Sequence, residues 1–347
     1  HTRFKGDWSS DVCSSDLTVS LLATDQSLTD SETVSITVTA VNNAPAFSGL
    51  DGAPTYVENG TAVVLDANVA IADTELTAAN NFGGATLTLA RNGGASNQDV
   101  FSASGTLGVL TEGDNLTVGG TTIGTVTTNN AGSLVLTFNA SATNALVNSA
   151  LRQIAYSNSS DAPPPSAQID WSFNDGNTGA QGTGGALQAS GSTTVTITAT
   201  NDAPTLADTA LSLTVAEDAG APSGAVGSLV SAFTGGISDA DSNASSGIAI
   251  TATVETNGTW YYTTNAGTNW SAIGTVDATQ SLLLADNANT RVYFAPAADY
   301  NGTSTGALTL RAWDQTSGSA GTKVSTAGTG GTTAFSSATD VVDLTVT

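Results

Sequence analysis

Two acid-x-acid motifs give this chain its clearest chemical capability. Asp73-Thr74-Glu75 follows the apolar residues Ile71 and Ala72, and Asp239-Ala240-Asp241 follows Ile237. In each motif two carboxylates stand two residues apart at the end of a strand-like segment. Ca²⁺ takes about six to eight hard oxygen ligands, which carboxylates, side-chain amides and backbone carbonyls supply. Both motifs therefore indicate a divalent-cation site, although acids in an acidic protein also serve simply to solvate loops.

The composition narrows the classes of partner. Of 347 residues, 7 are Lys or Arg and 30 are Asp or Glu, which gives a formal net charge of -23. A chain this acidic lacks the basic face that binds nucleic acid or an anionic membrane surface. No apolar run reaches the ~20 residues of a membrane-spanning helix. With 39% hydrophobic residues, the chain is apolar enough to fold.

The residues needed for common catalytic mechanisms are scarce. The single His is His1, the single Cys is Cys13, and Lys323 stands in a segment rich in Gly, Ser and Thr, where nothing would desolvate it. Glycines 182, 184 and 185 precede a strand-like segment and not a helix, which argues against a dinucleotide-binding loop. Paired carboxylates could serve a hydrolase, but among so many acids chance pairs are expected. We therefore predict that the chain is not an enzyme.

An internal repeat organises the chain. Residues 38–45 read VTAVNNAP and residues 197–204 read ITATNDAP, 159 positions later. Each Ala-Pro follows an alternating β-branched run, which is typical of a half-buried strand. The final residues 342–347, VDLTVT, match the same strand. An acid, Glu58 or Glu217, comes thirteen residues after each proline, and an aspartate closes the strand before each terminal strand, at Asp25, Asp175 and Asp314.

These repeats predict an all-β chain with boundaries at the Asn-Asn and Asn-Asp segments. Residues 18–43 are expected to be the last strands of one module, residues 44–202 a second module, and residues 203–347 a third that lacks its final linker. One short helix is expected between Thr143 and Tyr156, where Leu146, Val147, Leu151 and Ile154 recur at helical spacing.

The first seventeen residues differ from the rest of the chain. HTRFKGDWSSDVCSSDL holds the only His, the only Cys and two of the seven basic residues. It resembles the in-frame translation of a short-read sequencing adapter, with both fixed parts of the adapter matched. We therefore interpret residues 1–17 as a non-native leader, and the remainder as a fragment of a longer metagenomic gene.

From Thr18 to Thr347, the junction motifs resemble the cadherin-like and bacterial Ig-like tandem repeats of large surface adhesins. The resemblance implies Greek-key β-sandwich modules in an elongated array, which acts as an adhesive stalk on a bacterial surface or in a secreted protein. It implies Ca²⁺ at the junctions between modules. It also implies that the partners are neighbouring repeats and, beyond them, a second copy, a glycan or a surface protein. Nucleic acid and direct membrane insertion are not expected.

The resemblance also implies a ligand set for each junction. For the first junction it comprises Asn42, Asn43, Asp73, Glu75 and Asp175. For the second it comprises Glu58, Asn201, Asp202, Asp239, Asp241 and Asp314, and Glu217 is left for a third. The linkers are shorter and less acidic than the cadherin Asp-x-Asn-Asp-Asn, so we expect fewer or more weakly bound ions.

An aromatic group supports an alternative function. If Asn265-Ala266-Gly267 turns a hairpin, Tyr262 would face Trp270 across it, and Trp260 would share their face. Such a row can stack on sugar rings, which would make this module a carbohydrate-binding domain. Aromatic residues in a strand are also ordinary core residues. The exposure of Trp270 distinguishes the two interpretations.

Overall fold

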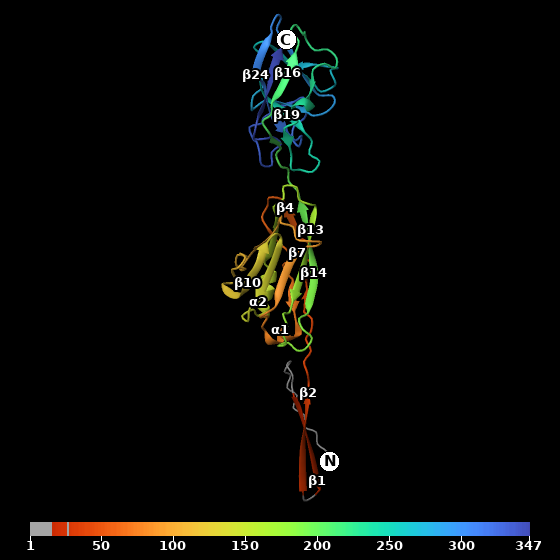
Figure 1. Ribbon diagram of the computed structural model, residues 1–347, viewed down its shortest axis with the longest axis vertical. Coiled ribbons are helices and arrows are strands. Elements are labelled where there is room, and N and C mark those ends of the chain that lie inside the picture. The colour runs from red at the N-terminus through yellow and green to blue at the C-terminus, as the bar shows by residue number, and fades with distance from the viewer. Residues whose placement is uncertain (1–15, 26–27) are drawn as a thin grey trace. The chain divides into compact units, whose positions relative to one another are not determined.

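The computed structural model describes residues 16–25 and 28–347 (Figure 1). The chain divides into two compact units, with the boundary in the sequence between Ala199 and Thr200. Each unit is an all-β sandwich with its own hydrophobic core, which confirms the predicted fold class. Most of the leader that we interpret as adapter sequence lies outside the described residues, and the sequence-based module boundaries stay a prediction.

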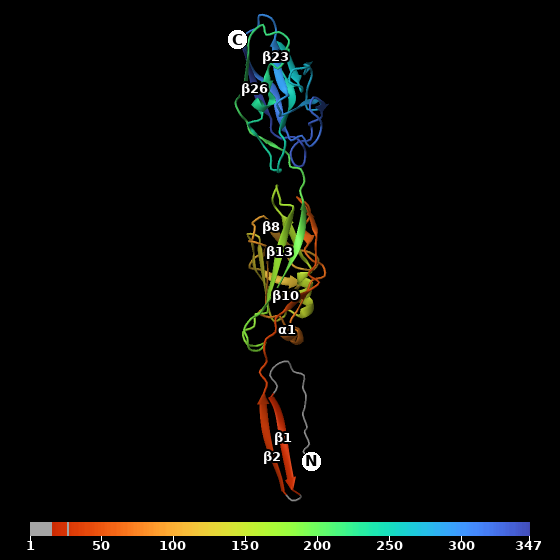
Figure 2. The ribbon, with the colours of Figure 1, turned by 90° about the vertical axis from the view of Figure 1, so that its right-hand side faces the viewer.

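The first unit begins with a two-stranded antiparallel hairpin, formed by β1 (Asp16–Asp25) and β2 (Leu28–Thr37) (Figure 2). The apolar residues Val34, Ile36 and Val38 alternate along its second strand and the segment that follows. They are 45%, 46% and 52% exposed. This alternation creates an apolar face that is about half exposed.

The sandwich of the first unit has three sheets. Its seven-stranded sheet has the order β4 (Thr55–Val57), β14 (Gln188–Thr198), β13 (Ser166–Asn174), β7 (Thr86–Arg91), β11 (Ser133–Phe138), β10 (Thr121–Asn130) and β9 (Asn115–Val118). Its three-stranded sheet has the order β5 (Val63–Val64), β12 (Ile154–Asn158) and β8 (Asp99–Ala103). A two-stranded sheet pairs β3 (Ala46–Ser48) with β6 (Ala70–Ala72).

Strand β14 shows why this sequence folds as predicted. Thr193, Val195 and Ile197 alternate with exposed residues and are 1%, 0% and 5% exposed. One face of the strand therefore lies on the core, where it meets Trp171 and Phe173 of β13. β4 completes the edge by pairing with β14 in parallel, with Thr55 opposite Thr196.

The first unit has two short helices where one was predicted. α2 (Asn144–Leu151) is capped by the Thr143 hydroxyl and buries Val147 and Leu151, as its spacing predicted. Ile154 was wrongly placed on this helix, because it begins β12 and pairs with Ala103. α1 (Thr74–Ala79) was not predicted, because its six residues are too few to show a helical repeat.

A buried polar network joins the two larger sheets of the first unit. The Asp99 carboxylate on β8 accepts hydrogen bonds from Arg91 on β7, at 2.7 Å and 2.5 Å, and from the Tyr156 hydroxyl on β12, at 2.6 Å. Asn158 donates a further bond at 3.0 Å. Burial and the bond to Asp99 raise the Tyr156 pKa, so this hydroxyl stays protonated and acts as a donor.

The second unit has a related plan. Its six-stranded sheet has the order β16 (Leu211–Val215), β26 (Asp340–Val346), β24 (Gly302–Trp313), β19 (Gly247–Thr253), β22 (Ser281–Ala285) and β25 (Lys323–Val324). Its four-stranded sheet has the order β17 (Ser228–Leu229), β23 (Arg291–Pro296), β20 (Gly258–Thr263) and β21 (Ser271–Ala272). β15 (Thr205–Leu206) pairs with β18 (Ile237–Ser238), and one 3-10 turn, η1, spans Val230–Phe233.

Both units place the candidate site in the same way. The strand that follows the linker pairs with the strand that precedes the acid-x-acid motif, as β3 with β6 and as β15 with β18. In both, an early strand runs parallel to the last strand, as β4 with β14 and β16 with β26. The repeat found in the sequence therefore corresponds to a repeated topology, and equivalent residues occupy equivalent positions.

Candidate metal centres

In the first unit, Asp73 begins a helix instead of lying on a loop. It follows β6 directly and is the N-cap of α1, where its Oδ1 accepts bonds from the backbone N–H groups of Glu75, at 3.0 Å, and Leu76, at 2.9 Å. The cap leaves Oδ2 for another partner. Glu75 lies in the first helical turn, and its charge acts on the Asp73 carboxylate.

The linker reaches one acid of this motif, Glu75, and the aspartate that follows β13. The Asn42 side chain donates to Asp175 Oδ2 at 2.7 Å, and the Asn43 backbone N–H donates to Glu75 Oε2 at 3.2 Å. Asn42, Asp73 and Asp175 are only 5%, 3% and 0% exposed. Hydrogen bonds and neighbouring charges thus link the five residues that the resemblance assigned to the first junction.

The electrostatics of this group favour a cation. Burial raises the Asp73 pKa, the Leu76 N–H lowers it, and the neighbouring charges of Glu75 and Asp175 raise it further. Asp73 Oδ2 and Asn42 Oδ1 are buried and have no hydrogen-bond partner in the described structure. Buried oxygens of this kind, among like charges, fit the ligand chemistry of Ca²⁺.

The second unit repeats the arrangement. Asn201 donates from its side chain to Asp314 Oδ2 at 2.9 Å, and the Asp202 backbone N–H donates to Asp241 Oδ2 at 2.8 Å. The Asp241 N–H in turn donates to Asp239 Oδ1 at 2.9 Å. Burial is the main cause that raises the Asp239 pKa, and the charges of Asp241 and Asp314 add to it. Asp239 Oδ2 is also buried without a hydrogen bond among the described residues.

Glu58 and Glu217 lie at the other end of their respective units. The Glu58 backbone N–H donates to Thr198 O at the end of β14, whereas Asp175 lies beside Leu187 at the start of the same strand. The two acids are therefore separated by the length of an eleven-residue strand. Glu217 occupies the matching place beside Thr347, where its Oε2 accepts from the Asn301 side chain at 3.2 Å. The grouping of Glu58 with residues of the second unit stays a prediction.

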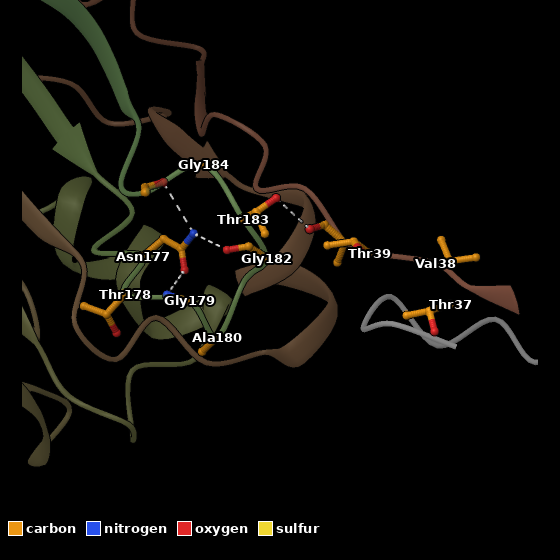
Figure 3. Close-up of a pocket in the computed structure, with 12 residues that line it drawn as sticks. Thr37, Val38, Thr39, Asn177, Thr178, Gly179, Ala180, Gly182, Thr183 and Gly184 are labelled. Atoms are coloured by element: carbon orange, nitrogen blue, oxygen red, sulfur yellow. Dashed lines mark hydrogen bonds between the residues drawn. The ribbon is translucent and has the colours of Figure 1, made fainter. Parts of the chain in front are cut away.

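A glycine-rich loop between β13 and β14 was not predicted as part of the site (Figure 3). Asn177 shapes this loop by donating to Gly182 O at 3.1 Å, and Gln181 donates to the backbone carbonyl of Asp175 at 3.0 Å. The loop and residues 37–40 of the linker line a pocket of about 670 Å³. The closely spaced glycines were the available signal, but we considered them only as a nucleotide-binding motif.

The predicted aromatic row of the second unit does not exist. Tyr262 pairs with Ser271 and not with Trp270, and this shift of one residue places Trp270 on the opposite face. Trp260 is 0% exposed in the core, and the Tyr262 hydroxyl donates to Gly321 O. Trp270 is half-buried, and its indole N–H donates to Gly224 O. These three residues therefore form no continuous platform for a sugar ring.

Two further observations concern other classes of function. Lys323 is exposed, and its ammonium group donates to the Thr275 carbonyl at 2.6 Å. Within residues 16–25 and 28–347, no helix has both the length and the apolar character needed to cross a bilayer.

Comparison with solved structures finds similar chains among cadherin ectodomains. The chain is similar to mouse cadherin-23 EC22-24, with 11% identity, coverage of 96% of this chain and 74% of that chain, and a TM-score of 0.35. It is similar to mouse protocadherin-24 EC1-3, with 13% identity, coverage of 96% and 80%, and a TM-score of 0.35. For the human desmocollin-1 ectodomain the identity is 12%, the coverage 96% and 48%, and the TM-score 0.33. No protein-family model matches the chain, and no curated protein matches its sequence.

Proposed function

We propose that this chain is a repeat segment of a large bacterial surface or secreted protein, that it acts as an adhesive stalk, and that Ca²⁺ stiffens its junctions. The observation that carries the proposal is the duplicated site. In both units a linker asparagine, an acid-x-acid motif and a strand-ending aspartate are joined by hydrogen bonds. Two separate folding units have kept the same arrangement of acids, whereas acids that only solvate loops have no reason to converge.

The donor set suits calcium. Asp73 Oδ2 and Asn42 Oδ1 in the first unit, and Asp239 Oδ2 in the second, are buried oxygens that lack a hydrogen bond within the described structure. Together with Glu75 and Asp241 they supply hard oxygen ligands, and extracellular modules of this chemistry typically bind Ca²⁺ with Kd of about 10⁻⁴ to 10⁻³ M. Glu58 and Glu217 are proposed as Ca²⁺ ligands beside the linker that follows each unit.

Calcium titration of the full chain by isothermal calorimetry tests this function. We expect saturable binding at millimolar Ca²⁺. We expect weaker binding of Mg²⁺, because this smaller ion demands a stricter coordination geometry. Asp73→Asn and Asp239→Asn should each remove one class of sites. Asp114→Asn and Asp208→Asn, which change exposed aspartates in the same units, serve as matched controls. Equal binding by the site variants and the controls would refute the assignment.

Stiffening is a separate part of the proposal and needs its own measurement. Small-angle X-ray scattering of the full chain in chelator and in millimolar Ca²⁺ reports the distribution of interatomic distances. We expect calcium to narrow the distribution of conformers. If calcium binds but the scattering curves superimpose, the site has a stabilising role only.

The hairpin β1–β2 is proposed to be the last pair of strands of a preceding module. The 159-residue repeat aligns Ile36 with Val195 and Val38 with Ile197. The second member of each pair is buried in the first unit, whereas the hairpin residues are about half exposed. In this chain Ile36→Lys should leave thermal stability unchanged, while Val195→Lys should unfold the first unit. A large loss of stability in Ile36→Lys would show that the hairpin face is already covered.

A further inference from the structure

We propose that Asp175 and Asp314 are not metal ligands but the acceptors of a clasp that fixes each linker to the unit following it, without an ion. We call this arrangement the linker clasp. In the first unit it consists of Asn42, Asp175 and the loop 176–187. In the second unit it consists of Asn201, Asp314 and the segment 315–335, which contains β25.

The two oxygens of Asp175 have separate partners. Oδ1 accepts from the backbone N–H groups of Asn177 and Leu187, both at 3.0 Å, and so holds the two ends of the loop together. Oδ2 accepts from the Asn42 side chain at 2.7 Å. The carboxylate is fully buried, and three N–H donors compensate its charge where a cation would otherwise be needed.

The orientation of the Asn42 amide follows from its surroundings. Its nitrogen faces two acceptors, Asp175 Oδ2 and the Gly185 carbonyl at 2.9 Å, and only an NH₂ group can donate to both. An amide that donates to Oδ2 fills one of the two acceptor positions of that oxygen and places its partly positive N–H groups beside it, which disfavours a metal ion there. Asn42 therefore replaces the cation at Asp175, and its own Oδ1 remains available to an ion at Asp73.

The backbone strengthens the clasp. The Asn42 N–H donates to Thr183 O, and the Thr183 N–H donates to Ala40 O, both at 2.9 Å. Val41 and Thr183 form a parallel bridge, so the linker joins the glycine-rich loop as a very short added strand. Figure 3 shows this loop beside the linker, with Thr183 directed towards it.

The second unit carries an independent copy. Asp314 Oδ1 accepts from the Thr316 N–H at 2.8 Å and holds its loop, while Oδ2 accepts from the Asn201 side chain. The Ala203 N–H donates to Gly331 O at 2.7 Å. The two loops differ in length and sequence, so the shared feature is one carboxylate that binds its loop with one oxygen and its linker with the other.

Amide hydrogen exchange of the full chain in chelator tests the clasp. The amides of Asn42, Thr183 and Ala203 should be protected without calcium. Asn42→Asp replaces the donor with a second carboxylate, so exchange at Asn42 and Thr183 should accelerate roughly tenfold or more. Asn201→Asp should do the same at Ala203. Asn97→Asp is the matched control, because Asn97 is an exposed asparagine of the same unit outside the clasp. It should leave the protection of the Asn42 and Thr183 amides unchanged.

Two outcomes would overturn the proposal. One is a linker that is unprotected in chelator and becomes protected in Ca²⁺, because an ion would then hold it. The other is unchanged protection in both Asn42→Asp and Asn201→Asp. The exchange of the Leu89 amide on β7 and of the Leu284 amide on β22 reports whether each core stays folded. If one variant unfolds its unit, the clasp of the other unit can still be measured. Calcium affinity, measured separately, tests the proposed function and does not decide this result.

Discussion

Replacing Asp99 with asparagine is expected to destabilise the first unit strongly and leave the second unchanged. Asp99 is 3% exposed and accepts bonds from Arg91, Tyr156 and Asn158. Asparagine keeps the shape but removes the charge, and it turns one acceptor into a donor that faces other donors. Arg91 then keeps its charge without its partner.

The size of the effect follows from burial. Breaking a buried ion pair by changing one partner costs about 3 to 5 kcal/mol. The Arg91 side chain is 20% exposed and can recruit water, so we expect the lower end, about 3 kcal/mol. In a unit of this size, each kcal/mol of lost stability lowers Tm by about 2 to 4 °C. The expected fall in Tm is therefore about 6 to 12 °C. Tyr156→Phe removes a single bond to Asp99 and should cost about half as much.

Differential scanning calorimetry of the full chain measures this shift, and the transition of the second unit serves as an internal reference. Hydrogen exchange at Leu89 and Leu284 assigns each transition to its unit. A fall of less than about 2 °C for Asp99→Asn, or an equal fall in both units, would contradict the reasoning, since the network lies wholly in the first unit.

Three further predictions follow from single residues. In chelator, the raised pKa of Asp73 means that the folded state binds the proton more tightly than the unfolded state. The first unit should therefore gain stability as the pH falls towards 3.8, the ordinary pKa of an aspartate, and a urea midpoint that falls instead would contradict this. With saturating Ca²⁺ the slope should reverse, because protons then compete with the ion. Trp260→Ala should cost about 3 to 5 kcal/mol in urea unfolding, whereas Trp270→Ala, at a half-buried position, should cost clearly less. Gly132→Ala should lower the Tm of the first unit, because Gly132 has φ +75° and a Cβ there would collide with the Ser96 carbonyl.

The sequence predicted those features that depend on alternation and on repetition. The buried face of β14 follows from Val195 and Ile197, and the 159-residue repeat located equivalent acids in both units. Side-chain alternation survives any change in the surrounding fold, because a strand with one buried face has a fixed period of two. The grouping of the five residues of the first site came instead from the resemblance of the junction motifs to cadherin-like repeats.

Other features depend on contacts that no local pattern encodes. Asp73 caps a helix of only six residues, which is too short to show periodicity. The register of β20 and β21 depends on how the turn closes, and a shift of one residue moved Trp270 to the other face. The acceptors for Asn42 lie 133 and 143 residues further along the chain, so the clasp could not be read from the sequence around the linker.

The parallel pairing of an early strand with the last strand has a mechanical consequence. When a unit is pulled by its two ends, β4 and β14 slide past each other along their length, as do β16 and β26. The bonds of such a pair are loaded together in shear and do not open one after another. Three residue pairs share this load in the first unit and five in the second. The second unit should therefore be the slower to rupture at this interface, a property governed by the rate of unfolding under force and not by equilibrium stability.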